Sequence, residues 1–243
     1  MSDTDTVLSA PPALNSGLAA ESYVEEFRMK GRVQVRDLLT DCSARALSHK
    51  LQNETRWTVT FNDGEKKCDV ERYDGNLRRH LTYAAWDRAT TSFQYIYERH
   101  ALSWDREPYP DRDHYYAGVV GFLNAPEFLD LMREITGIPE IAYTDRQATL
   151  YRPGDFLTVH NDEAKLAKRL VAYVLNMTPL WRSDFGGASQ FIDDRGNIAE
   201  GYVPAFNVPE HLSCTGSSRG DGRYAVWRFA LLNHRLVARR LNG

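Results

Sequence analysis

A histidine and an aspartate two positions apart, His160 and Asp162, are the pair most suggestive of chemistry in this sequence. The turn residues Pro153-Gly154 precede a run, 156–161, that alternates between two faces as a half-buried strand does. At about 3.3 Å per residue, the Cα atoms of His160 and Asp162 lie roughly 7 Å apart on one face. Such a pair can bind one metal ion, and a second histidine would complete the 2-His-1-carboxylate triad of non-haem iron sites. Alone, the pair is more often a strand-end histidine bonded to its neighbour.

Composition limits the classes of function. The chain has 243 residues, 42% of them hydrophobic and 26% charged, which is typical of a globular domain. A net charge of −3 gives no general attraction to nucleic acid or to an anionic membrane, so we expect neither as a partner. No run approaches the roughly 18 apolar residues of a membrane span. Three cysteines without a CxxC pair favour reduced thiols and a cytoplasmic location.

The first half of the chain predicts helices, with a few strands between them. Residues 1–20 lack the pattern of a secretory signal and are interpreted as a flexible tail. Thr40 is expected to cap a helix, and Asn62-Asp63-Gly64 to turn a hairpin after a strand at 57–61. Further expected elements are a helix at 21–29, a strand at 32–39, one or two helices over 76–102, a loop at 104–116, and a helix capped by Asn124 that ends at Gly137.

The second half predicts mostly short strands. They are expected at 147–151, 156–161, 169–176, 188–192, 202–206, 211–215 and 223–231. Helices followed by many short strands indicate an α+β fold, a β-sandwich or barrel with helices packed on one sheet. The mouth of such a barrel would provide a concave site for the metal-like pair.

Several motifs in this half, in this order, resemble one family. They are Tyr151-x-x-Gly154-x-Phe156-x-x-x-His160-x-Asp162, Tyr173-Val174-Leu175-Asn176, Gly186-Gly187-Ala188-Ser189-Gln190-Phe191, Pro204-x-Phe206-Asn207 and Arg223-Tyr224-Ala225-Val226-Trp227. The segment 147–232 resembles the prolyl-hydroxylase branch of the Fe(II)/2-oxoglutarate dioxygenases, and within it the ribosomal-protein prolyl hydroxylase-like group and its bacterial relatives. This resemblance implies a double-stranded β-helix (jelly-roll) core at about 141–235, within a single domain spanning 21–243.

The resemblance also implies roles for individual residues. His160 and Asp162 correspond to the first two iron ligands, and His211, twelve residues before Arg223, to the third. Arg223 would bind the distal carboxylate of 2-oxoglutarate through a two-pronged contact, and Tyr151 would donate a hydrogen bond to this cosubstrate. The implied reaction consumes O2 and 2-oxoglutarate, releases succinate and CO2, and hydroxylates an unactivated C–H bond.

Other residues are assigned less specific roles. Trp181 and Tyr115 are candidates for the substrate mouth: Trp181 is alternatively a core aromatic, and Tyr115 belongs to a loop that could line a cleft. For Tyr151 a place in the core is an equal alternative. His234 lies beyond Arg223 and is interpreted as a surface or packing histidine.

Three functions remain open on the sequence alone. A prolyl residue of a protein or peptide is the first substrate class, and a free amino acid or another small molecule is the second. The third is a jelly-roll binding protein without a competent iron site. It is suggested because Val208, Pro209 and Glu210 alone separate Asn207 from His211, where the family has a strand.

Overall fold

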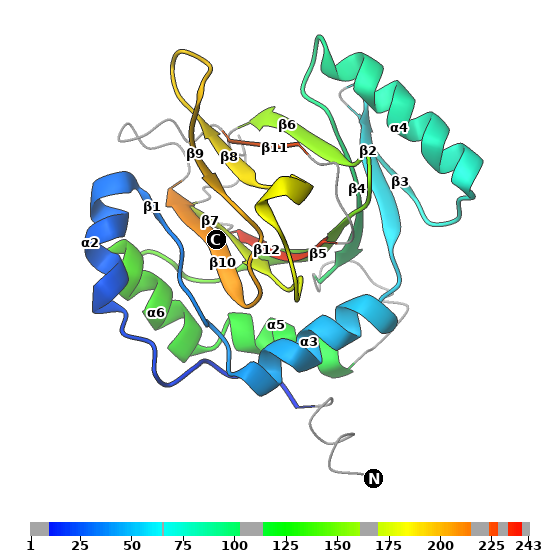
Figure 1. The fold of residues 1–243 in the computed structure, drawn as a ribbon. Helices are drawn as coiled ribbons and strands as arrows, with labels where there is room; N and C mark the ends of the chain where they lie inside the picture. The colour runs from blue at the N-terminus through cyan, green and yellow to red at the C-terminus, as the bar shows by residue number, and fades with distance from the viewer. Residues whose placement is uncertain are drawn as a thin grey trace.

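The computed structural model describes residues 10–64, 66–102, 114–160, 170–214, 224–227 and 233–239, and for residues 114, 145, 210–214, 224–227 and 233–239 it describes the backbone only. The fold is mixed α+β, as expected, and its strand pairs are antiparallel (Figure 1). Its α-helices are α2 (Glu21–Lys30), α3 (Asp41–Asn53), α4 (Gly75–Ala89), α5 (His114–Leu123) and α6 (Pro126–Thr136). In the described part, none of them is long and apolar enough to cross a membrane.

The strands of the first half are β1 (Arg32–Val33), β2 (Thr58–Asp63), β3 (Lys66–Val70) and β4 (Tyr95–Ala101). Those of the second half are β5 (Asp145–Tyr151), β6 (Phe156–His160), β7 (Val171–Asn176), β8 (Ser189–Ile192), β9 (Ile198–Tyr202), β10 (Val208–Cys214), β11 (Tyr224–Trp227) and β12 (Asn233–Arg239). A short 3-10 helix, η1 (Ser183–Phe185), precedes β8.

Local signals in the first half are confirmed where side-chain chemistry fixes the backbone. The Thr40 hydroxyl accepts a hydrogen bond from the Ser43 amide and caps α3 as expected. The hairpin β2–β3 forms as expected, but Asn62 and Asp63 still pair within it, and of the predicted turn residues Gly64, with a φ of 63°, is the one that leaves the strand. The strand expected over 32–39 is wrong in length, because β1 ends at Val33 and the chain then turns at Asp37, whose φ is 52°.

The interpretation of 76–102 as helical is wrong beyond residue 89. Asp74 caps α4 through hydrogen bonds from the Asn76 and Leu77 amides, but the helix ends at Ala89 and β4 follows. Strand pairing overrides local preference here, since β4 pairs with β2, β5 and β6.

The helix α6 ends at Gly137 as predicted, with a φ of 67° that suits glycine. The predicted cap is wrong: Ala125 occupies the N-cap position, and the Asn124 side chain instead accepts a hydrogen bond from the Thr144 amide. The loop predicted at 104–116 lies mainly outside the described residues, and its last residues, Tyr115 and Tyr116, belong to α5.

The predicted strands of the second half are confirmed with small shifts, except for 202–206, and except that only Tyr224–Trp227 of the strand predicted at 223–231 lies within the described residues. The chain forms β9 at Ile198–Tyr202 instead, because the Asp193 side chain accepts hydrogen bonds from the Arg195 and Asn197 amides and so closes a tight turn after β8. The segment Val208–Cys214, where a strand seemed to be missing, is the strand β10.

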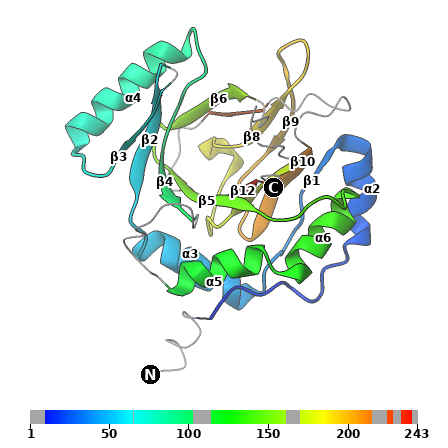
Figure 2. The same ribbon diagram turned by 180° about the vertical axis from the view of Figure 1, so that it is seen from behind.

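The strands follow the order β1-β10-β7-β12-β5-β4-β6-β11-β8-β9, with β2 and β3 paired beside β4. The helices α2, α3, α5 and α6 gather along one side, where they bury the main hydrophobic core with β5 and β7 (Figures 1 and 2). This agrees with the predicted packing of helices on one sheet. The exception is α4, which covers a separate cluster beside β2 and β4.

The two ends of the strand order, β1 and β9, are joined by side chains. Arg32 of β1 contacts Glu200 of β9, with 2.6 Å between Nε and Oε2, and its guanidinium carbon lies 4.5 Å from the centre of the Phe191 ring. This contact fastens one edge of the sheet to the other. Part of the segment expected to be a flexible tail packs against the chain after β1: the Asn15 backbone amide donates a hydrogen bond to the Leu38 carbonyl. Residues 1–9 lie outside the described chain.

Candidate metal and cosubstrate site

His160 is the last residue of β6, and its ring is held in one orientation. Nδ1 lies 2.9 Å from the backbone oxygen of Thr158. An Nδ1–H donor in this hydrogen bond leaves the lone pair on Nε2, which is buried. This is the tautomer that a metal-binding histidine needs, since a hydrogen bond from the other ring nitrogen fixes its orientation. The geometry at His160 therefore fits a metal ligand.

The other two predicted ligands are placed only in part. Asp162 lies outside the described residues, and for His211 only the backbone is described. His211 lies inside β10 at an irregularity in its pairing with β7, and β10 is separated from β6 in the strand order by β7, β12, β5 and β4. Within the described residues, no group of three or more His, Cys, Asp or Glu side chains is arranged to hold a metal.

Strand pairing brings the neighbour of the predicted cosubstrate arginine to His160. Tyr224, the first residue of β11, is paired with His160, and Arg223 directly precedes it in the sequence but lies outside the described residues. The backbone of His234 pairs with Leu150 in β12. The roles predicted for Asp162, His211 and Arg223 thus stay predictions.

A row of aromatic rings connects His160 with Tyr151. The ring of Phe93 lies 5.6 Å from that of His160 and 5.8 Å from that of Tyr95. Tyr95 and Tyr97 follow at 5.2 Å, and Tyr97 stacks on Tyr151 at 5.1 Å, all between ring centres. The row joins the predicted iron ligand to the predicted cosubstrate tyrosine along one face of β4.

The sequence does not reveal Phe93, Tyr95 and Tyr97 as a row, because its pattern predicts a helix in this segment. Their spacing of two was the available signal, since alternate residues of a strand share one face. Together the rings form an aromatic wall that runs from Phe93, which is 44% exposed beside His160, to the buried Tyr151.

The remaining predicted residues lie apart from this row or at its far end. Tyr151 is buried and packs in a small cluster with Phe191 and Tyr202. Trp181 lines a pocket near the β7–β8 connection, where its indole N–H donates to the Gly186 carbonyl at 2.8 Å. Tyr115 is 3% exposed in the main core, and it does not line that pocket.

The turn that leads into β6 is fixed from two sides. Gly154 adopts a φ of 86°, which favours glycine, and its carbonyl accepts a hydrogen bond from the Trp86 indole of α4 at 3.2 Å. The Asp155 side chain, 1% exposed, accepts hydrogen bonds from the Arg78 guanidinium and, at 2.8 Å, from the Arg152 amide. Helix α4 thereby anchors the start of the strand that carries His160.

A second buried carboxylate, Glu98 of β4, holds the other side of this turn. The Arg152 guanidinium contacts both of its oxygens, at 2.5 Å from Nε and 3.1 Å from Nη2. Burial and the neighbouring Glu98 raise the pKa of Tyr73 to about 12, and burial raises the pKa of Asp155 to about 7 although the Arg78 guanidinium opposes this. The cluster is one of paired charges, so its first role is to hold the turn.

Comparison with known proteins identifies the class. The sequence model of the 2OG-Fe(II) oxygenase superfamily matches residues 146–215, the segment that contains His160, Asp162 and His211. The recognition made from the sequence is thereby confirmed at the level of this superfamily. No curated protein sequence matches the chain.

Solved structures with a similar fold include three oxygenases. A prolyl-4-hydroxylase of Pseudomonas putida is 14% identical, with a TM-score of 0.53 over 93% of this chain and 100% of the other. An oxidoreductase of the 2OG-Fe(II) oxygenase family from Burkholderia pseudomallei is 15% identical, with a TM-score of 0.57 over 94% and 93%. A prolyl hydroxylase of Trichoplax adhaerens, in complex with a hypoxia inducible factor peptide fragment, is 13% identical, with a TM-score of 0.57 over 91% and 88%. At these identities the likeness concerns the fold.

Proposed function

We propose that this 2OG-Fe(II) oxygenase hydroxylates an unactivated C–H bond of a prolyl residue in a protein or peptide. The observation that carries the proposal is His160: it ends β6, its ring is oriented by the contact of Nδ1 with the Thr158 backbone oxygen, and it pairs with the residue after Arg223. The superfamily match over 146–215 and the fold shared with two prolyl hydroxylases support it. We also propose that the strands β5 to β12 form a double-stranded β-helix, which their order favours.

In this proposal each part of the site has one task. His160, Asp162 and His211 hold Fe(II), which together with 2-oxoglutarate and O2 supplies the oxidising chemistry. Arg223 binds the distal carboxylate of 2-oxoglutarate, and the Tyr151 hydroxyl donates a hydrogen bond to it. The aromatic row between His160 and Tyr151 lines the space beside the iron ligand.

One observation favours the alternative of a binding protein without a competent iron site. His211 lies inside the strand β10, whereas the family resemblance places the third ligand in a loop. In the strand order, four strands lie between β10, which carries His211, and β6, which carries His160, so the two histidines are not on neighbouring strands. Hydroxylation of a free amino acid or another small molecule is the remaining alternative within the enzyme class.

Anaerobic titration with Fe(II), with and without 2-oxoglutarate, separates these functions. An oxygenase should bind one Fe(II) and bind it more tightly when 2-oxoglutarate is present. The His160→Ala variant should lose this binding, while His49→Ala, a change at a half-exposed histidine on α3, should keep it. A folded wild-type protein that binds no Fe(II) would support the binding-protein alternative.

The choice of third ligand needs a separate measurement. A crystal structure with Mn(II) should place an imidazole nitrogen of His211 at about 2.0–2.2 Å from the metal. A metal bound by His234, or by two protein side chains alone, would show that the assignment of His211 is wrong.

Once iron binding is established, the substrate class can be tested with peptides. Proline-containing peptides should raise succinate formation above the level seen with 2-oxoglutarate alone, and their product should gain one oxygen atom on a proline. If free amino acids stimulate turnover and peptides do not, the small-molecule alternative is correct.

A further inference from the structure

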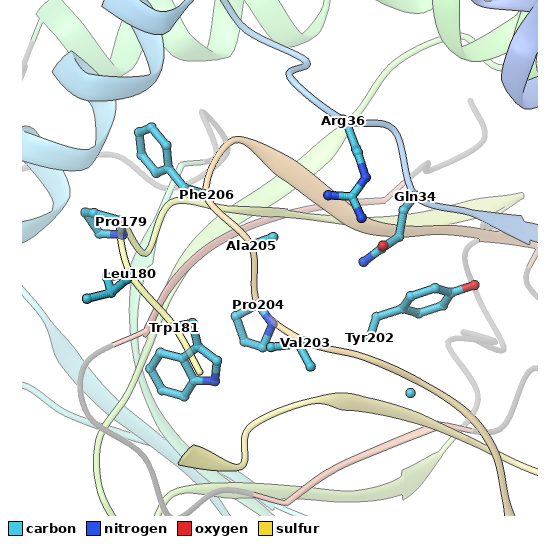
Figure 3. A pocket seen from close by; sticks show the side chains of 11 residues that line it. Gln34, Arg36, Pro179, Leu180, Trp181, Tyr202, Val203, Pro204, Ala205 and Phe206 are labelled. Carbon is cyan, nitrogen blue, oxygen red and sulfur yellow. The ribbon is translucent and has the colours of Figure 1, made fainter. Parts of the chain in front are cut away.

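A pocket of about 480 Å³ lies between Trp181 and Leu180 on one side and Arg36 and Gln34 on the other (Figure 3). It is formed where β7 connects to β8 and where β9 connects to β10. The strand β11 lies between β8 and β6 and pairs with both. Through Val226 of β11, the first residue of β8, Ser189, lies level with Leu157. Through Tyr224, Phe191 near the end of β8 lies level with His160. The pocket opens beyond the start of β8, so it is separate from the candidate metal site.

One wall of the pocket is apolar and held in place. Leu180, which is 80% exposed, and Trp181 form this wall together with Pro179. The indole of Trp181 is fixed by its hydrogen bond to the Gly186 carbonyl and by edge contact with the Phe185 ring, 5.8 Å between centres. A fixed aromatic ring loses little conformational freedom when a ligand covers it, and the exposed leucine adds apolar surface that a ligand can bury.

The opposite wall is polar, and its two side chains have no described partner. Figure 3 shows Arg36 and Gln34 across from Trp181, with the segment 203–206 between the two walls. Among the described residues, neither the Arg36 guanidinium nor the Gln34 amide makes a hydrogen bond or an ion pair. Most other arginines of the described chain contact a carboxylate, as Arg32 does with Glu200.

These two walls define the chemistry of a ligand. A guanidinium favours a carboxylate, to which it can donate two parallel hydrogen bonds, and the neighbouring amide of Gln34 can donate a third. The apolar wall favours a hydrocarbon or aromatic group attached to that carboxylate. We infer that the pocket is a second binding site, which takes a small organic acid with an apolar body.

The test uses phenylpropionate as a probe, with metal-free protein and without 2-oxoglutarate. A ligand of this size should bind with a Kd on the order of 1 mM. Binding is followed by the NMR signal of the Trp181 indole N–H, which is assigned from its loss in a Trp181→Phe variant. Phenylpropionamide, the same molecule without the charge, should bind about tenfold more weakly, because it cannot pair with the Arg36 guanidinium.

Variants identify the residue responsible for the preference. Arg36→Gln should remove the difference between acid and amide, whereas Arg195→Gln, the same change at an exposed arginine in the β8–β9 turn, should keep it. Equal binding of acid and amide to the wild-type protein would overturn the inference. So would an Arg36→Gln variant that keeps the preference, or a Trp181 signal that stays unmoved at about ten times the expected Kd. Because no iron is present, these results are independent of the proposed oxygenase activity.

Discussion

Replacing Asp155 with asparagine tests how the turn before β6 is held. The Asp155 carboxylate is 1% exposed and faces the Arg78 guanidinium and the Arg152 amide. An ordinary aspartate has a pKa of 3.8, whereas burial raises the pKa of Asp155 to about 7 against the opposing effect of Arg78. Asparagine has nearly the same shape and keeps an acceptor for the Arg152 amide, but it cannot titrate.

The sign of the effect follows from proton binding. Because the folded state holds this proton more tightly than the unfolded state, Asp155 contributes most to stability at low pH. That contribution is lost as the pH rises through about 7. Between pH 5 and pH 7 each pH unit lowers this contribution to the free energy of unfolding by about 1.4 kcal/mol, and above pH 7 it changes little, so the total fall from pH 5 to pH 8 is about 3 kcal/mol.

The assay is urea unfolding of the wild-type protein and of Asp155→Asn at several pH values from 5 to 8. The free energy of unfolding of the wild type, minus that of the variant, should fall by about 3 kcal/mol over this range. Asp130→Asn, at an exposed carboxylate paired with Arg133, should show no comparable trend. If the difference in free energy of unfolding between wild type and Asp155→Asn does not change with pH, the reasoning is wrong. The Asp155 carboxylate would then be ionised over the whole range, stabilised by the Arg78 guanidinium.

Three further changes test the site and the closure of the sheet. His160→Ala should abolish Fe(II)-dependent conversion of 2-oxoglutarate to succinate with the circular dichroism spectrum unchanged; succinate formation at the wild-type rate would contradict its role as a ligand. Arg223→Ala should raise the KM for 2-oxoglutarate by about two orders of magnitude, and Arg223→Lys should recover part of this, because a point charge replaces a two-pronged contact; a KM within a few-fold of wild type would mean that another residue binds the cosubstrate. Arg32→Ala should lower the free energy of unfolding by about 1–2 kcal/mol, since it removes the ion pair with Glu200 and the contact with an aromatic ring. Lys30→Ala, whose more exposed ammonium lies 3.6 Å from Glu200, is the control and should cost less than about 0.5 kcal/mol.

Local chemistry in the sequence determined much of the fold. The side chain of Thr40 caps a helix, the φ of Gly137 ends one, and Gly154 turns the chain before β6, each because a single residue satisfies or frees the backbone at that point. The alternation up to His160 likewise predicted the strand that carries the candidate iron ligand. These predictions depend on neighbours within a few residues, which the sequence contains.

Features that depend on pairing between distant strands were decided only by the tertiary structure. The segment from Tyr95 to Ala101 became a strand because β2, β5 and β6, from distant parts of the chain, supply its hydrogen bonds. That pairing places Tyr95 and Tyr97 in the aromatic row beside His160. The local sequence pattern predicts a helix for the segment that contains these two tyrosines. The sequence also does not predict that Arg36 lies across from Trp181. The two residues are far apart along the chain, and the pocket exists because the sheet brings their two segments together.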